Sequence, residues 1–222
     1  MARRRTAVLI SGNGSNLQAL LDAAADPAYP AEIVLVIANR PAAYGLVRAE
    51  LAGVPSRCID HRAFANREAF DAAMQAELER AEVDLVCLAG FMRLLTPGFV
   101  AHWRDRLVNI HPSLLPAFPG LDTHARALKE GCALAGCTVH LVRYELDTGP
   151  VLVQGAVPVL PGDTEETLAG RVLEVEHPCY VRALDLFASG RFTVDGEVAR
   201  LRDERPGERL LLHPLLLAPA GA

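Results

Sequence analysis

Short apolar, β-branched runs alternate with stretches of helical periodicity along the first half of the chain, and this alternation limits the folds it can adopt. The strand-like runs fall near 6–11, 32–38, 55–60, 84–90 and 106–110, and the helical patterns near 15–25, 43–52, 64–81 and 97–103. Strands and helices that alternate in this way form parallel sheets with crossover helices. The first half therefore predicts a doubly wound, mostly parallel α/β sheet of Rossmann-like type.

The second half of the chain follows a different pattern. After residue 111 come a proline-rich loop, then a short helix and two strand candidates, near 123–131, 136–144 and 150–158. We expect these strands to pair antiparallel, which makes this part of the sheet mixed. A long helix then extends to about residue 189, with Asp163 as its N-cap and Pro178 kinking or interrupting it. The segment 192–201 predicts a final strand or hairpin.

Composition limits the classes of protein that fit. The 222 residues are 51% hydrophobic, which supplies a core for one large α/β domain. The net charge is −5 and no long basic cluster is present, so we expect no nucleic-acid partner. No apolar run approaches the roughly 18 residues of a membrane span, so we expect no membrane partner either. The apolar end of the chain is expected to pack on the body or to be disordered.

The five cysteines indicate where the protein works. They form no C-x-x-C pair, and their odd number argues against a closed disulfide framework. Reduced thiols suit the cytoplasm. A C-x4-C spacing occurs once, without a second pair of ligands, so we expect no metal site.

The stretch TAVLISGNGSNL, residues 6 to 17, places a glycine-rich turn between the first strand and the first helix. Main-chain N–H groups and the positive end of the helix dipole favour an anion at such a junction. The stretch lacks the third glycine of a dinucleotide fingerprint and the lysine of a P-loop. It therefore predicts a phosphate-sized cradle, with the side chains of Asn13, Ser15 and Asn16 as further partners. The alternative is a tight turn in which Ser15 or Asn16 caps the helix.

Three polar residues follow predicted strands at the edge where ligands bind in open α/β sheets. Asn109 and His111 are two residues apart, so on an extended strand their side chains point to the same side. Both donate hydrogen bonds, and together they could stabilise one oxyanion while Asp147 orients the imidazole and keeps it protonated. A packed or surface histidine and a turn aspartate remain the alternative.

Five ordered motifs resemble those of the phosphoribosylglycinamide formyltransferase family. They are ISGNGSNLQAL, LAGFMRLL, VNIHPSLLPAFPG, ELDTGPV and EVEH, and they span residues 7 to about 189. The resemblance implies the formyltransferase fold. It also implies one domain over 1–200, with a phosphate-binding half at 1–110, a folate-binding and catalytic half at 111–200, and a tail at 201–222.

The resemblance further implies an activity in de novo purine biosynthesis. A formyl group would move from the co-substrate 10-formyltetrahydrofolate to the amino group of glycinamide ribonucleotide, without a metal or a covalent enzyme intermediate. The enzyme would be a monomer or a homodimer. The implied catalytic residues are Asn109, His111 and Asp147. The implied ribonucleotide-binding residues are Gly12, Asn13, Gly14, Ser15, Asn16 and Glu176. The implied folate-binding residues are Arg67, Met92, Arg93, Leu94, Leu95, Asn109, Arg143, Tyr144, Glu145, Leu146 and Asp147.

Related activities share parts of this pattern. Formyltetrahydrofolate deformylase resembles the same core but normally has a regulatory domain before it, whereas here the first strand begins by residue 6. Methionyl-tRNA formyltransferase has an additional RNA-binding domain, for which we expect no counterpart here. A noncatalytic phosphate- or nucleotide-binding module needs only the glycine loop and leaves Asn109, His111 and Asp147 unexplained.

Overall fold

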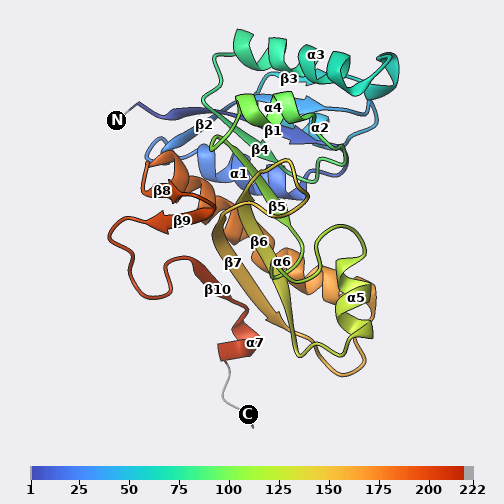
Figure 1. The fold of residues 1–222 in the computed structure, drawn as a ribbon, viewed down its shortest axis with the longest axis vertical. Coiled ribbons are helices and arrows are strands. Elements are labelled where there is room, and N and C mark those ends of the chain that lie inside the picture. Colours follow the sequence, from blue (N-terminus) through green and yellow to red (C-terminus); the bar gives the residue numbers. More distant parts are fainter. Residues whose placement is uncertain (1, 218–222) are drawn as a thin grey trace.

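One eight-stranded sheet forms the centre of the computed structural model, which describes residues 2–217 (Figure 1). The strand order is β10-β7-β6-β5-β4-β1-β2-β3. In chain order its strands are β1 (Arg4–Ile10), β2 (Ala31–Ala38), β3 (Ser56–Cys58), β4 (Leu85–Leu88), β5 (Leu107–His111), β6 (Leu134–Leu141), β7 (Val151–Pro158) and β10 (Leu210–Leu212). The strands β8 (Phe192–Asp195) and β9 (Val198–Leu201) form a separate antiparallel hairpin.

The helices alternate with the strands in the first half, as the sequence predicts. They are α1 (Ser15–Ala24), α2 (Gly45–Leu51), α3 (Arg67–Arg80), α4 (Pro97–His102), α5 (Thr123–Lys129), α6 (Glu165–Ala188) and α7 (Pro214–Leu217), with a 3-10 turn η1 at His61–Ala63. Within the part of the chain that is described, no helix is both long and apolar enough to cross a membrane.

The sheet is parallel except at one strand. The strands from β3 to β5 all pair in parallel, whereas β6 is antiparallel to both β5 and β7. The predictions of a doubly wound sheet and of a mixed second part are therefore confirmed. The carboxyl ends of β1, β2, β4 and β5 lie at one edge, where the polar residues that follow them come together.

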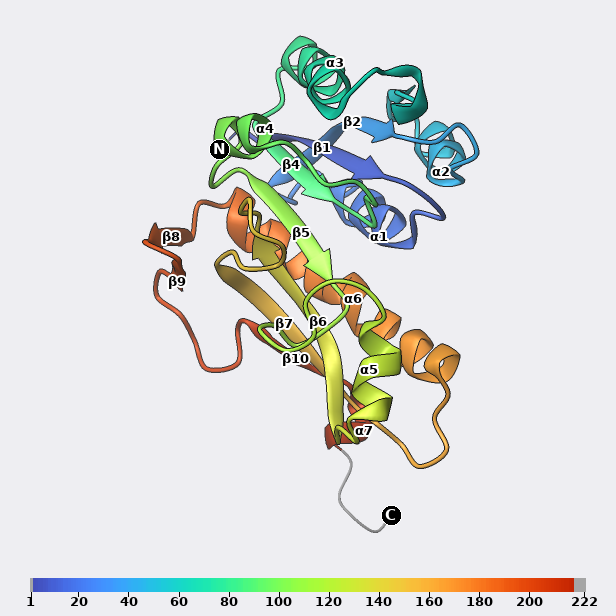
Figure 2. The same ribbon diagram turned by 45° about the vertical axis from the view of Figure 1, so that its right-hand side comes forward.

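Two hydrophobic cores cover the two faces of the sheet. One contains Leu17 and Leu20 of α1 together with Val172 and Tyr180 of α6, and it continues over β6 and β7. The other contains residues of α3 and α4, including Met74, against the opposite face of β1, β2 and β4. Figure 2 shows α3 and α4 on one side of the strands and α1 on the other. This layering holds the strand ends of the candidate site rigid.

The predicted N-cap of the long helix was wrong, and of the two outcomes predicted at Pro178, a kink or an interruption, the interruption does not occur. Its N-cap is Thr164, not Asp163, because the Thr164 and Thr167 hydroxyls form a reciprocal capping box with the main chain. Asp163 instead pairs with Arg171 at 2.7 Å. Pro178 does not interrupt the helix, which continues through it to Ala188, and a kink at this residue stays a prediction. Packing of the helix against β6 and β7 outweighs the one main-chain hydrogen bond that proline removes.

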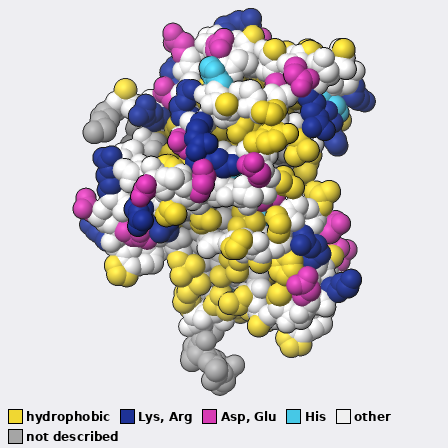
Figure 3. Space-filling model, viewed as in Figure 1, with side chains coloured by type: hydrophobic (Ala, Val, Ile, Leu, Met, Phe, Trp, Pro, Cys, Tyr) yellow, Lys and Arg dark blue, Asp and Glu magenta, His cyan; other side chains and the backbone are white. Residues whose placement is uncertain are grey.

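The end of the chain adds to the sheet. In the region expected to be a tail, residues Leu210–Leu212 form β10 beside β7, while 218–222 lie outside the described residues. Leu210 and Leu212 are exposed, and Figure 3 shows hydrophobic side chains gathered over β6, β7 and β10 on this face. The division of the chain at residues 110 and 200 stays a prediction.

Candidate active site

The glycine-rich loop joins β1 to α1 as the sequence predicts. Strand β1 ends at Ile10 and α1 begins at Ser15. The N-cap is Gly14, in the left-handed conformation with φ 75°, and no side chain caps the helix. The alternative cap by Ser15 or Asn16 is therefore wrong. The first N–H groups of α1 are left for another partner.

The loop and α2 pack so closely that neither Gly14 nor Gly45 has room for a side chain. A Cβ on Gly14 would lie 2.9 Å from the Cα of Gly45, and a Cβ on Gly45 would lie 2.3 Å from Cδ1 of Ile10. The N–H of Gly45 also donates to the carbonyl of Gly12. The first turn of α2 thus supports the loop directly.

Within the described residues, the main-chain carbonyl groups of the loop are hydrogen-bonded, whereas its main-chain N–H groups are not. The carbonyl of Gly12 accepts from Gly45, and that of Gly14 accepts from Gln18. Arg48 donates to the main-chain carbonyl of Asn13 at 2.9 Å and to its Oδ1 at 2.8 Å. Within residues 2–217, the N–H groups of Gly12, Asn13 and Gly14 find no partner. The main-chain N–H groups of the loop are therefore free to bind a ligand, whereas its carbonyl oxygens already accept hydrogen bonds. This is the arrangement of an anion site.

A cavity of about 300 Å³ opens in front of this loop. Its walls are Ser11, Gly12, Asn13, Gly14, Ser15, Asn16, Arg40, Ala89, Gly90 and Met92. The structure thus brings together all five predicted loop residues. Arg40 is a cation that sequence reasoning missed. Its position just after the second predicted strand was the available signal, because that strand ends at the same edge as the first.

Glu176 faces the same region from α6. Its Oε2 accepts a hydrogen bond from Nδ2 of Asn16 at 2.7 Å. Burial raises the pKa of Glu176, against the lowering effect of the Asn16 hydrogen bond and of the nearby His111. Oδ1 of Asn16 is buried without a partner. Glu176 therefore joins the anion loop to the neighbourhood of His111.

His111 and Asp147 form a buried pair at the end of β5. His111 Nδ1 lies 3.4 Å from Asp147 Oδ2, and their side chains are 7% and 6% exposed. The other ring nitrogen, Nε2, lies 2.9 Å from the carbonyl oxygen of Phe118. Both ring nitrogens thus face oxygen acceptors. This environment accommodates an imidazolium, which donates from both nitrogens.

Asp147 is held in an uncommon backbone conformation. Its φ is 56°, in the left-handed region that aspartate and asparagine tolerate better than other side chains apart from glycine. Its Oδ2 also accepts the main-chain N–H of Gly120 at 2.9 Å. The proline-rich loop after β5 and the loop after β6 are therefore joined at this carboxylate.

His140 completes the cluster, and sequence reasoning missed it. It is the register partner of Asn109 across β5 and β6. Burial lowers the pKa of His140, and its Nδ1 donates to the Leu141 carbonyl at 3.0 Å. Neutral Nε2 therefore accepts from Nδ2 of Asn109 at 3.2 Å. This contact orients the Asn109 amide and leaves its second N–H for the site.

The residues predicted to bind folate fall into separate groups. Met92 lines the anion cavity, Leu95 is buried in the core, and Leu94 is exposed. Arg143, Tyr144 and Glu145 line a second cavity of about 460 Å³. Its other walls are Pro97, Val100, Ala101, Arg104, Val142, Thr148 and Glu197.

Seven of the predicted folate residues line neither cavity, namely Leu94, Leu95, Asn109 and Asp147, described above, together with Arg67, Arg93 and Leu146. Nε of Arg93 is buried without a partner, Leu146 is 55% exposed, and Arg67 is exposed at the first turn of α3. Their assignment stays a prediction. Among residues 2–217, no three His, Cys, Asp or Glu side chains lie close enough to hold a metal ion.

The comparisons with known proteins agree with this fold. The formyl transferase family matches residues 4–184, and the chain therefore belongs to that family. Within it, the chain is similar to phosphoribosylglycinamide formyltransferases. The one from Escherichia coli (strain K12) is 46% identical over 198 residues, or 89% of this chain and 93% of that protein. The crystal structure of glycinamide ribonucleotide transformylase 1 from Symbiobacterium toebii has 49% identity and a TM-score of 0.88, and the match covers 90% of this chain and 95% of that one.

Two further relatives differ from this chain in length or in activity. The trifunctional purine biosynthetic protein adenosine-3 of Drosophila melanogaster is 52% identical over 199 residues, and this chain spans 15% of its length. A solved formyltetrahydrofolate deformylase from Pseudomonas syringae has a TM-score of 0.85 but 26% identity, over 90% of this chain and 66% of that one. The resemblance of the motifs to phosphoribosylglycinamide formyltransferase is thus confirmed. The deformylase is less similar in sequence to this chain than these formyltransferases are.

Proposed function

We propose that this chain transfers the formyl group of 10-formyltetrahydrofolate to the amino group of glycinamide ribonucleotide. The observation that carries the proposal is the cluster of Asn109, His111 and Asp147. His140 links it, with Nε2 at 3.2 Å from Asn109 and 3.7 Å from Asp147. Glu176 lies between the cluster and the anion loop. An anion loop at one side suits the ribonucleotide phosphate. The folate is assigned to the second cavity, whose wall includes the loop that carries Asp147.

The reaction needs donors where negative charge develops. The substrate amine attacks the formyl carbon, and the carbonyl oxygen becomes an oxyanion in the tetrahedral species. Asn109 offers its second amide N–H, and His111 offers Nε2–H, which exchanges the Phe118 carbonyl for the stronger, charged acceptor. Each such donor contributes about 2.7–4 kcal/mol of transition-state stabilisation.

The proton balance is simple. The bond between the formyl carbon and the folate nitrogen breaks, one proton leaves the attacking amine, and one proton reaches the folate nitrogen. Protonated His111, with Asp147 at its Nδ1, is placed to give its Nε2 proton to the folate nitrogen and then to take up the proton that the amine releases. Binding both substrates at one sheet edge supplies the orientation that the step requires.

The anion loop determines how the ribonucleotide is held. Its phosphate accepts from the free N–H groups of residues 12 to 16 and pairs with Arg40 at the cavity wall. Glu176 accepts from the ribose hydroxyls or from the glycinamide end. The protein is assigned to the cytoplasm, where a reducing environment keeps its five thiols free.

The test is a direct assay with three acceptors. The purified chain receives 10-formyltetrahydrofolate with glycinamide ribonucleotide, with charged tRNA, or with water alone. Formylation of the ribonucleotide is expected, together with a raised melting temperature in the presence of each substrate. Hydrolysis of the folate at the same rate without the ribonucleotide would instead identify a deformylase. Stabilisation by the ribonucleotide alone, without transfer, would identify a binding module.

Glu176 gives a prediction about pH. Its pKa in the folded chain is raised above the ordinary value of 4.5, so above pH 4.5 the folded chain binds more protons than the unfolded chain. The free energy of unfolding therefore falls as pH rises from 4.5 through the raised pKa. Glu176→Gln removes this loss and keeps an oxygen for Asn16. The free energy of unfolding of the variant, relative to that of the wild type, is expected to increase as pH rises from 4.5 to the raised pKa of Glu176. Above that pKa the difference is expected to stay constant.

Urea unfolding of both proteins between about pH 4 and pH 8 measures this difference. The same substitution is expected to weaken ribonucleotide binding about tenfold, because a charged acceptor is lost. Parallel pH profiles for the two proteins would show that Glu176 is not the group responsible.

A further inference from the structure

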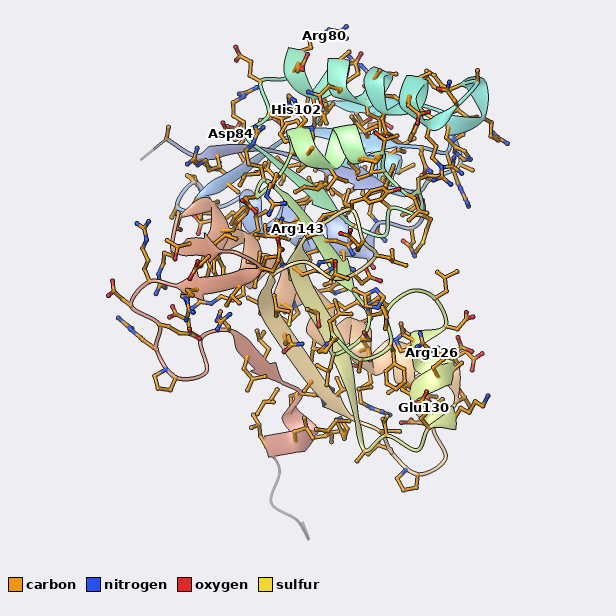
Figure 4. The ribbon with its side chains drawn as sticks, viewed as in Figure 1. Arg80, Asp84, His102, Arg126, Glu130 and Arg143 are labelled. Carbon is orange, nitrogen blue, oxygen red and sulfur yellow. The ribbon has the colours of Figure 1, made fainter. Side chains whose placement is uncertain are left out.

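Arg143 is held between two carboxylates from different parts of the chain. Its Nε donates to Oε2 of Glu197, in the turn of the β8–β9 hairpin, at 2.6 Å. Its Nη2 donates to Oδ1 of Asp105, just after α4, at 2.8 Å. Its Nη1 donates to its neighbour Val142 at 3.2 Å. Figure 4 shows Arg143 near the middle of the molecule.

These contacts use three of the five N–H groups of the Arg143 guanidinium. Its side chain is 6% exposed, and each of its three side-chain nitrogens already donates a hydrogen bond. A buried guanidinium is tolerated when it is paired in this way. Arg143 lines the second cavity but serves there as a link between its own loop, α4 and the hairpin.

We propose that the β8–β9 hairpin positions the loop 142–148, and with it Asp147, through the contact of Glu197 with Arg143. The proposal rests on the proposed function, because the loop is the one assigned to folate binding and catalysis. Glu197 and Arg143 line the second cavity, but in this scheme they act through the loop that carries Asp147 and are therefore positioning residues.

The geometry of the loop explains why it needs a support. The loop lies between the ends of β6 and β7, so residues 142–148 are outside the β6–β7 ladder. Asp147 has a left-handed backbone within it, and a small displacement changes the distance from its carboxylate to His111. The hairpin is not part of the main sheet, yet Glu197 reaches both Arg143 and Arg104, at 2.6 and 3.0 Å. The hairpin turn therefore fixes both this loop and the end of α4.

Global stability depends little on Glu197. Its side chain is 55% exposed, so water can take its place beside the buried Arg143, and its ion pair with the exposed Arg104 contributes little to folding. Arg143 keeps its partner Asp105 when Glu197 is changed. A change at Glu197 therefore tests loop position and not folding.

The first test is Glu197→Ala, with kinetics for each substrate. We expect the KM for 10-formyltetrahydrofolate to rise about tenfold and kcat to fall severalfold, because reacting groups are misplaced. The KM for the ribonucleotide and the melting temperature are expected to stay close to wild type. Glu197→Gln keeps a neutral acceptor for Arg143 and should restore part of the loss.

The matched control is Glu204→Ala, which removes another exposed ion pair of the same region, with Arg209 at 2.9 Å. It should leave all kinetic constants unchanged. The double variant Glu197→Ala with Arg143→Met is expected to be no worse than Arg143→Met alone, because the two residues act as one unit. Additive losses would overturn the proposal. So would equal increases in both KM values, or wild-type kinetics in Glu197→Ala.

Hydrogen exchange separates failure of this proposal from failure of the proposed function. If the wild-type chain shows no formyl transfer, the function is wrong. The amide exchange of residues 142–148 is still expected to accelerate in Glu197→Ala and not in Glu204→Ala. Unchanged exchange in both variants would overturn the positioning role whatever the activity.

Discussion

Replacement of Asp147 by asparagine is expected to reduce kcat by about 10³-fold or more, with little change in fold. Asparagine loses the negative charge that faces Nδ1 of His111 at 3.4 Å, and loss of the matching carboxylate in a comparable His–Asp pair costs about 10⁴-fold. Asparagine also tolerates the left-handed φ of 56° and keeps an oxygen for the N–H of Gly120. Steady-state kinetics and a melting curve measure the two effects separately.

The matched control for this variant is Asp122→Asn. Asp122 has nearly the same backbone conformation, with φ 57°, but its side chain makes no capping hydrogen bond. It should therefore keep wild-type turnover. An Asp147→Asn enzyme with unchanged kcat would remove Asp147 from the mechanism. A reduced melting temperature in Asp147→Asn alone would indicate a structural role instead.

The strand pattern of the sequence predicted much of the fold and part of the site. Each predicted strand of the first half is present in the sheet. Because parallel strands bring their carboxyl ends to one edge, the sequence alone places the glycine loop near the Asn109–His111 pair. Period-two alternation placed Asn109 and His111 on one side of β5. This argument does not place Asp147 or Glu176. The position of Asp147 depends on the loop between β6 and β7, and that of Glu176 depends on how α6 packs on the sheet.

What could not be predicted depends on contacts between distant segments. The partnership of Asn109 with His140 follows from the register of β5 on β6, which a sequence pattern does not specify across a long connection. Arg143, predicted to bind folate, lines the second cavity, but its ion pairs with residues 38 and 54 positions away could not be predicted from the sequence. Arg40 was not singled out because nearly all the cations of this chain are arginines, so an arginine by itself is a weak signal of a binding site. Thr164 displaced Asp163 as N-cap because both residues have side chains that cap helices well.

A Gly14→Val substitution is expected to raise the KM for the ribonucleotide about 100-fold or more, while the KM for the folate changes little. The new Cβ would lie 2.9 Å from the Cα of Gly45, so the backbone of the loop must move. Its N–H groups then lose their common direction toward a phosphate, and each charge-assisted hydrogen bond lost costs about 1.5–3 kcal/mol. Isothermal titration with each substrate measures the two affinities independently of turnover.

Strain at Gly14 must be separated from loss of the anion site, because valine at φ 75° is unfavourable at any position. Gly53→Val supplies the comparison: Gly53 has φ 68°, nothing lies within 4 Å of its added Cβ, and it lines neither cavity. Both variants should therefore lose stability, by about 1–2 kcal/mol from the backbone alone. Only Gly14→Val should lose the ribonucleotide. Equal weakening of both substrates in Gly14→Val would mean that the loop supports the whole site, and that the phosphate is bound elsewhere.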